Sequence, residues 1–146
     1  DYDTSTGKRR KNKDGKPLIH WVHSVLEITK YNLKQCLFGL HLLNDNVKQV
    51  AIVESEKTAL IMSIEFPNYT WMSTGSLNGF KYEYLAPLIG RYIIAFPDKG
   101  CYNNWKETAE ILNEKGFHIE ISKLLENKDF KDGWDLVDVL VYESEK

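Results

Sequence analysis

An apolar run that ends in a carboxylate and then turns helical constrains the fold of this chain more than any other stretch. Residues 50–53 are apolar and largely β-branched, which is typical of a strand buried on both faces. Glu54 follows at once, and apolar side chains then recur at helical spacing over residues 57–64. Because a strand, a tight turn and a helix make the first half of a βαβ unit, the stretch predicts a parallel sheet.

The rest of the chain repeats this alternation of strands and helices. Further strands are predicted at residues 69–72, 92–96 and 117–121, and further helices at 82–88, 105–112 and 133–140. The pattern predicts an α/β fold of Rossmann-like type, in which about four mainly parallel strands are flanked by helices.

The two parts of the chain differ in charge. Residues 1–50 carry nine Lys or Arg side chains against five acids, whereas residues 51–146 carry ten against sixteen. We therefore expect two parts with different partners: a basic N-terminal β/α extension at 1–47 and an α/β domain at 48–146.

The basic extension has its own predicted elements. Asp14 and Gly15 indicate a turn that leads into a strand over residues 17–22, and apolar residues at helical spacing predict an amphipathic helix over 32–43. A basic arm of this kind neutralises nucleic-acid phosphates, and a solvated tail without a partner is the alternative. The candidate contacts include Lys8, Arg9, Arg10 and Lys11.

Composition excludes several classes of protein. The sequence has no apolar run near the about 20 residues that a membrane span requires. Its two cysteines do not form a Cys-x-x-Cys pair, so no structural zinc site is expected. We expect a cytoplasmic protein without a membrane partner, and the start at Asp1 predicts a segment of a longer chain.

Carboxylates follow two of the predicted strands. Glu54 comes directly after the first strand and Asp98 comes shortly after the third, so both are expected at the carboxyl edge of the sheet, where open α/β sheets bind ligands. Asp135 and Asp138 form either a second carboxylate pair or the solvated front of the last helix. Clustered carboxylates predict a Mg²⁺ site, although an acid such as Glu54 is also favoured beside any helix N-terminus.

A small-residue loop follows the second predicted strand. Gly75 permits close approach of a ligand to the backbone, while Thr74 and Ser76 offer hydroxyl groups. The loop is therefore a candidate phosphate contact.

These motifs, in this order and spacing, resemble the Toprim domain of bacterial and mobile-element primases. The resemblance covers roughly residues 48–142, and its best element is the acid-ended strand followed by Glu56-Lys57-Thr58-Ala59-Leu60. With the basic start and residues 38–43 included, the chain is similar to Toprim-like proteins of Bacteroidetes mobile elements.

The resemblance implies a function and a set of roles. It implies a module that acts in DNA replication or mobilisation, binds single-stranded DNA and Mg²⁺, and works with further domains such as a zinc-binding module. Glu54 would be the general acid or base of nucleotidyl transfer and Asp98 a metal ligand, with Lys57 and Lys99 as phosphate contacts.

The chain departs from the Toprim pattern at one position. An Asp-x-Asp motif is expected after the third strand, but Gly100 replaces the second aspartate. The remaining candidate ligands are Glu56, Asp135 and Asp138. An active protein would be a primase-type nucleotidyltransferase; the alternatives are a catalytically degenerate nucleic-acid-binding module and a flavodoxin-like or receiver-like domain, for which Lys123 is the candidate late lysine.

Overall fold

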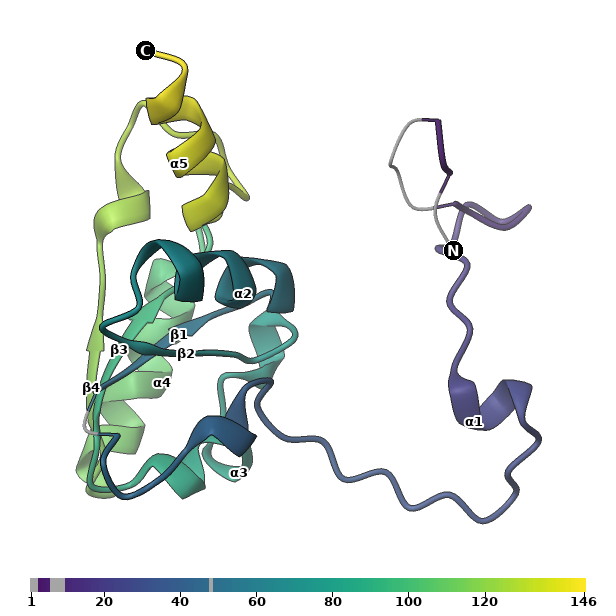
Figure 1. Cartoon of the computed structure of the whole chain (residues 1–146), viewed down its shortest axis with the longest axis horizontal. Helices are drawn as coiled ribbons and strands as arrows, with labels where there is room; N and C mark the ends of the chain where they lie inside the picture. The colour runs from purple at the N-terminus through teal and green to yellow at the C-terminus, as the bar shows by residue number, and fades with distance from the viewer. Residues whose placement is uncertain (1–2, 6–9, 48) are drawn as a thin grey trace. The chain divides into compact units, whose positions relative to one another are not determined.

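The computed structural model describes residues 3–5, 10–47 and 49–146. The chain divides into two compact units, residues 1–34 and residues 35–146 (Figure 1). The predicted division at 47/48 differs from this one, because residues 35–47 pack with the larger unit. None of the helices in the described ranges is both long and apolar enough to cross a membrane.

The larger unit is an α/β domain built on a four-stranded parallel sheet, as predicted. The strand order is β2-β1-β3-β4, with every neighbouring pair parallel. The strands are β1 (Gln49–Val53), β2 (Thr70–Ser73), β3 (Tyr92–Phe96) and β4 (His118–Ile121). The helices of the unit are α2 (Glu56–Glu65), α3 (Tyr82–Leu85), α4 (Tyr102–Glu114) and α5 (Leu136–Ser144), with short 3₁₀ turns at Leu40–Leu42, Leu77–Gly79, Ala86–Leu88 and Leu124–Glu126.

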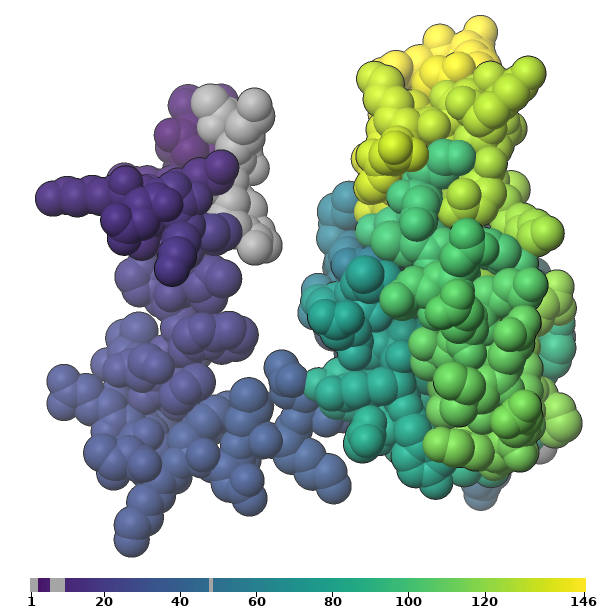
Figure 2. Space-filling view, turned by 180° about the vertical axis from the view of Figure 1, so that it is seen from behind, coloured from purple at the N-terminus to yellow at the C-terminus, as the bar shows by residue number. Residues whose placement is uncertain are grey.

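Helices cover both faces of the sheet (Figure 1). On one face Val50 and Ile52 pack with Trp105 of α4, and on the other Ala51 and Val53 join Met62 of α2 in a second core. Figure 2 shows the surface of α4 in green and the α5 region in yellow at one end of the unit. Because β1 is apolar on both faces and lies between β2 and β3, its continuous apolar run is what a central parallel strand requires.

The structure contradicts the helix predicted over residues 32–43. Phe38 instead forms an antiparallel bridge with Ser73, in which each backbone N–H donates to the other residue's carbonyl, at 2.9 and 3.2 Å. Gly39 adopts φ +83°, and a Cβ there would lie 2.8 Å from the Trp71 carbonyl oxygen. The segment therefore closes the free edge of β2, and this long-range pairing outweighs the local helical spacing. Leu37 is buried in the core, whereas Leu33 is exposed.

The smaller unit contains little regular structure in its described part. Asp14 and Gly15 form the predicted turn, closed by a bridge between Lys11 and Pro17. The strand predicted over residues 17–22 is wrong: the chain there is irregular and is followed by a single helical turn, α1 (Val22–Val25). An isolated pair of strands is marginal in water, so the hairpin does not extend.

The structure predicts that Leu37 stabilises the larger unit and that Leu33 does not. Leu37→Ala should lower the free energy of unfolding by about 2–5 kcal/mol, because it leaves a cavity in a side-chain core. Leu33→Ala is the matched control and should change it by less than about 0.5 kcal/mol. Urea unfolding followed by circular dichroism measures both. Equal losses of stability in the two variants would contradict a folded unit that begins between Leu33 and Leu37.

Candidate functional site

The register of the two central strands brings the predicted carboxylates to one edge. Val53, the last residue of β1, lies opposite Phe96, the last residue of β3. Glu54 follows the first of these and Asp98 lies two residues beyond the second. The two side chains therefore leave neighbouring strands at the carboxyl edge, which is where ligands bind in open parallel sheets.

Burial and neighbouring charges shift the pKa values of the two strand-end acids. Burial raises the pKa of Asp98 to about 7, and the negative charges of Glu54, Asp135 and Asp138 add to this effect, while the Lys57 ammonium opposes it. Burial also raises the pKa of Glu54, although a hydrogen bond from the Leu77 backbone lowers it in part. A partly desolvated site that holds several carboxylates favours a proton on one of them.

Asp135 is held in a different way, as the N-cap of α5. It accepts hydrogen bonds from the backbone N–H groups of Val137 (2.8 Å) and Asp138 (3.0 Å), and the Asp138 carboxylate accepts from the Asp135 backbone N–H (3.0 Å). This reciprocal arrangement is a capping box, and it fixes the start of the helix. The spacing of the two acids therefore has a structural explanation in the first turn of α5.

Two residues of α2 also bind the Asp135 carboxylate. The Thr58 hydroxyl donates to Asp135 Oδ2 at 2.5 Å, and Lys57 Nζ lies 3.2 Å from the same oxygen. Burial raises the pKa of Asp135, but these bonds, together with the Asp138 backbone bond, bring it below its ordinary value. Asp135 thus remains an anion, whereas Asp98, with a pKa of about 7, is about half protonated at neutral pH.

The four edge acids therefore do not form a symmetric metal cluster. Within residues 3–5, 10–47 and 49–146, no three or more His, Cys, Asp or Glu side chains are grouped so that they could hold a metal ion. The Glu56 side chain lies beside Gly75, since its Oε1 is 3.2 Å from the position that a Cβ on Gly75 would occupy. Glu54 and Asp98 remain, and two protein carboxylates suffice for Mg²⁺ where phosphate and water supply the other ligands.

The small-residue loop lies beside Glu54. The Gly75 backbone N–H donates to the Glu54 carbonyl at 2.8 Å, and Gly75 adopts φ +74°. The hydroxyl of Thr74 is buried and donates to the Ser76 carbonyl at 2.8 Å. The loop is thus placed next to the acids, but the Thr74 hydroxyl already has an internal partner.

Lys99 connects the Asp98 loop to the segment that precedes α5. Its ammonium donates to the Asn127 carbonyl at 3.0 Å and lies 3.9 Å from Glu126 Oε2. Its backbone exchanges hydrogen bonds with Gly133 and Trp134. Lys99 therefore holds two loops together, and its side chain is only 13% exposed.

Gly100 occupies the position at which the resemblance predicts an aspartate. It adopts φ +92°, a backbone conformation that disfavours a side chain, and its N–H donates to Glu126 Oε1 at 3.0 Å. The conformation of this loop thus suits the glycine that is present.

The remaining predicted contacts lie in the smaller unit. Arg10 and Lys11 are exposed there, next to the Asp14-Gly15 turn. Lys8 and Arg9 lie outside the described residues.

Lys123, the candidate late lysine of a receiver-like domain, lies over the Tyr102 ring, 5.4 Å from its centroid.

Sequence reasoning missed two residues at the edge. Thr58 is fully buried and hydrogen-bonded to Asp135, and the signal for its placement was its position three residues after the Ser55 N-cap of α2. Cys101 lies close enough to Glu54 and Asp98 that their charges, after burial, raise the pKa of its thiol. Its position three residues after Asp98 was the available signal.

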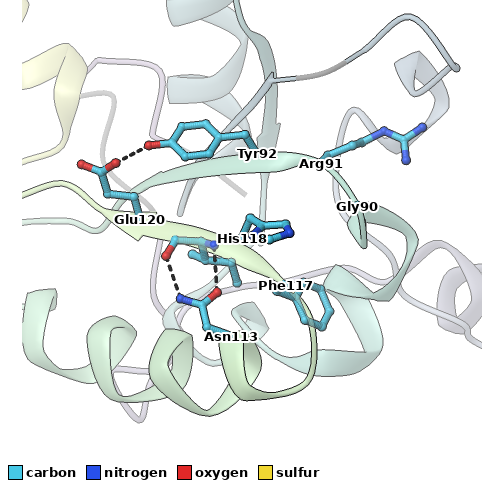
Figure 3. A pocket seen from close by; sticks show the side chains of 8 residues that line it. Gly90, Arg91, Tyr92, Asn113, Phe117, His118 and Glu120 are labelled. Carbon is cyan, nitrogen blue, oxygen red and sulfur yellow. Dashed lines mark hydrogen bonds between the residues drawn. The ribbon is translucent and has the colours of Figure 1, made fainter.

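A hollow of about 610 Å³ lies at the amino-terminal edge of the sheet, opposite the acidic edge (Figure 3). There Tyr92 donates a hydrogen bond to Glu120, and the Asn113 amide bonds both backbone groups of Ile119. The Arg91 side chain points away from these groups in Figure 3 and donates to the Asn44 carbonyl at 3.2 Å. In this hollow Tyr92 is bonded to Glu120 and Asn113 to Ile119, so the hollow is a weaker candidate than the acidic edge.

The fold and the acidic edge together define an α/β domain of parallel type with a carboxylate-bearing site at the ends of its central strands. The chain belongs to the family described as Domain of unknown function (DUF6371), whose model matches residues 1–99. The match therefore includes both Glu54 and Asp98 and ends before Asp135. Comparisons with curated proteins and with solved structures gave no match.

The raised pKa of Asp98 predicts a pH-dependent cost to folding. Between about pH 4 and pH 7 the unfolded chain ionises this carboxyl while the folded chain keeps its proton, so stability falls as the pH rises through this window. Asp98→Asn is neutral in both states. It should exceed the wild type in stability by about 2–4 kcal/mol at pH 8, because each pKa unit corresponds to about 1.4 kcal/mol, and should match it near pH 4.

Urea unfolding at both pH values measures this difference. Asp132→Asn, in the exposed loop before α5, is the control and should change stability by less than about 0.5 kcal/mol at either pH. A gain for Asp98→Asn that is the same at pH 4 and pH 8 would contradict the electrostatic account.

Proposed function

We propose that this chain is a Toprim-like module of the kind found in primases, which binds single-stranded nucleic acid at the carboxyl edge of its sheet. One observation carries the proposal: two carboxylates, Glu54 and Asp98, leave neighbouring parallel strands at a partly buried edge, where burial and the charge of Glu54 raise the pKa of Asp98 to about 7. A site of this kind suits a divalent cation, because a cation relieves the repulsion that the proton otherwise relieves.

In this proposal Asp98 is the metal ligand and Glu54 lies beside the ion, where its carboxyl group stays available for proton transfer. A single carboxylate leaves most positions of a six-coordinate Mg²⁺ to water and substrate phosphate, which is how Mg²⁺ is usually bound. Once bound, Mg²⁺ would neutralise charge on a transferring phosphoryl group.

Glu54 is the proposed general acid or base. It is half-buried, and burial raises its pKa from the ordinary value of 4.5, which brings it closer to the range in which a carboxyl group can both take up and release a proton. The Leu77 backbone fixes its position by a hydrogen bond. Gly75 donates its backbone N–H to the Glu54 carbonyl. Because glycine has no side chain, a phosphate can approach the backbone closely at this point.

Lys57 is the proposed phosphate contact at this edge. Its side chain is 59% exposed, although its ammonium pairs with Asp135. Because the Lys57 side chain is itself exposed, its ammonium can turn toward an incoming phosphate, while Thr58 and the backbone of α5 continue to bind the Asp135 carboxylate. Lys99 is less suited to this role because its ammonium is already bound to the loop before α5.

A second candidate function is a nucleic-acid-binding module whose chemistry has been lost. The specific observation in its favour is that only two edge acids are free of the capping box, while Asp135 is engaged by Thr58 and Lys57 and Gly100 stands in place of an acid. In that case the exposed basic residues Arg10 and Lys11 would carry the affinity through phosphate contacts.

Magnesium binding and oligonucleotide synthesis test the two candidates together. Isothermal titration of the full chain with Mg²⁺ should show binding that strengthens about tenfold from pH 6 to pH 8, because the ion displaces the Asp98 proton. Template-dependent synthesis on single-stranded DNA should require Mg²⁺ or Mn²⁺. Asp98→Asn should abolish both signals, and Glu54→Gln should lower synthesis at least a hundredfold while retaining weaker ion binding.

Asp132→Asn is the control for both assays and should behave as wild type. Synthesis that survives Glu54→Gln and Asp98→Asn would overturn the assignment of the site. DNA binding without Mg²⁺ binding or synthesis, unaffected by both substitutions, would favour the second candidate.

A further inference from the structure

An aromatic hollow of about 490 Å³ lies between α5 and the loop that precedes it. Trp134 and Tyr142 contribute its aromatic walls and Val141 an apolar surface. The α5 region that carries it is drawn in yellow in Figures 1 and 2. None of these residues belongs to the site proposed above.

The aromatic walls are held in place by packing and by backbone hydrogen bonds. The Trp134 and Tyr142 rings lie 5.4 Å apart, and Phe130 packs against both, at 5.9 and 6.3 Å between centroids. The Trp134 carbonyl accepts a hydrogen bond from the Lys99 backbone at 2.9 Å. The walls are therefore formed before any ligand arrives.

The rim of the hollow is acidic. Its lining includes the carboxylates of Asp129, Asp138 and Glu145 and the ammonium of Lys131, and the Lys146 ammonium lies over the Tyr142 ring. A phosphate-bearing ligand would meet net negative charge here. A cation would meet both the carboxylates and the negative faces of the rings.

The chain's own lysines already lie on these rings. Lys131 Nζ is 5.6 Å from the centroid of Trp134, and Lys146 Nζ is 4.3 Å from the centroid of Tyr142. Both distances are within the range of a cation–π interaction. Long lysine side chains of this kind can be displaced by a cation from a partner.

We propose that this hollow receives a lysine or arginine side chain of a basic partner polypeptide. The rings would take the cationic head by cation–π contact, Val141 would contact its alkyl stem, and Glu145 and Asp129 would pair with its charge. The inference does not depend on the proposed nucleotidyl-transfer site.

Nuclear magnetic resonance of the ¹⁵N-labelled full chain tests the proposal through the indole N–H of Trp134. The probes are a Gly-Lys-Gly-Lys amide, its arginine counterpart, a Gly-Glu-Gly-Glu amide and oligothymidylate. The basic peptides should shift the Trp134 signal and the acidic peptide should not. Trp134→Leu, followed through the backbone amide signals of Tyr142 and Glu145, should weaken binding of the basic peptides about 3- to 30-fold, which is the range expected for one cation–π contact.

Charge substitutions distinguish a cationic ligand from an anionic one. Glu145→Gln should weaken the basic peptides about two- to fivefold, whereas Lys131→Gln should tighten them, since it removes an internal competitor. Glu114→Gln, an exposed acid at the end of α4 outside the hollow, is the matched control and should have no effect. These three results together would support the proposal.

Two results would overturn the proposal. One is a Trp134 shift caused by oligothymidylate and not by the basic peptides, particularly if Lys131→Gln weakens it, because the hollow would then stack nucleobases. The other is the absence of any shift with basic peptides at millimolar concentration.

Discussion

The parallel pairing of β1 with β3 is the constraint on which the rest of the site depends. Because Val53 and Phe96 end their strands side by side, the residues that follow are brought together whatever their charge. The apolar packing of both sheet faces fixes this register, since a shift of one residue would exchange the side chains of β1 between the two differently shaped cores. The core thus holds Glu54 and Asp98 near enough that the charge of Glu54 raises the pKa of Asp98.

The pKa values of two acids at the carboxyl edge, Asp135 and Asp98, shift in opposite directions. Asp135 receives backbone, hydroxyl and ammonium partners and keeps its charge, so it stabilises the start of α5 and ties that helix to α2. Asp98 receives no comparable partners among the described interactions and is penalised by burial and by its neighbours, so its pKa rises to about 7. Asp135 therefore stabilises a helix, whereas Asp98 lowers the stability of the folded chain. Asp98 is the better candidate for function.

Much of the fold could be predicted from local pattern. The run at residues 50–53 indicated a strand buried on both faces of a parallel sheet, and the four strands are parallel as expected. The segment around Phe38 could not be predicted in this way, because its pairing with Ser73 is a contact between residues distant in the sequence, while its local spacing favours a helix. Gly39 was a local signal against that helix, because glycine is unfavourable in a helix interior, and the structure gives it φ +83°.

The site was predictable in position but not in detail. The strand ends located Glu54 and Asp98, but no sequence pattern specified that Thr58 and Lys57 would engage Asp135. The spacing of Asp135 and Asp138 before an apolar helix was a capping-box signal, and the structure gives that role to the pair. The difference matters, because the capping box removes Asp135 and Asp138 from the acids available for an ion.

The pKa of the Asp98 carboxyl in the folded chain tests this account most directly. Carbon-13 detection of its side-chain carboxyl across a pH titration should give a midpoint of about 7 in the wild type. In Glu54→Gln the midpoint should fall, because one of the charges that raises it has been removed. An ordinary midpoint near 3.8 in both proteins would contradict the claim that the β1–β3 register forces these two carboxylates together.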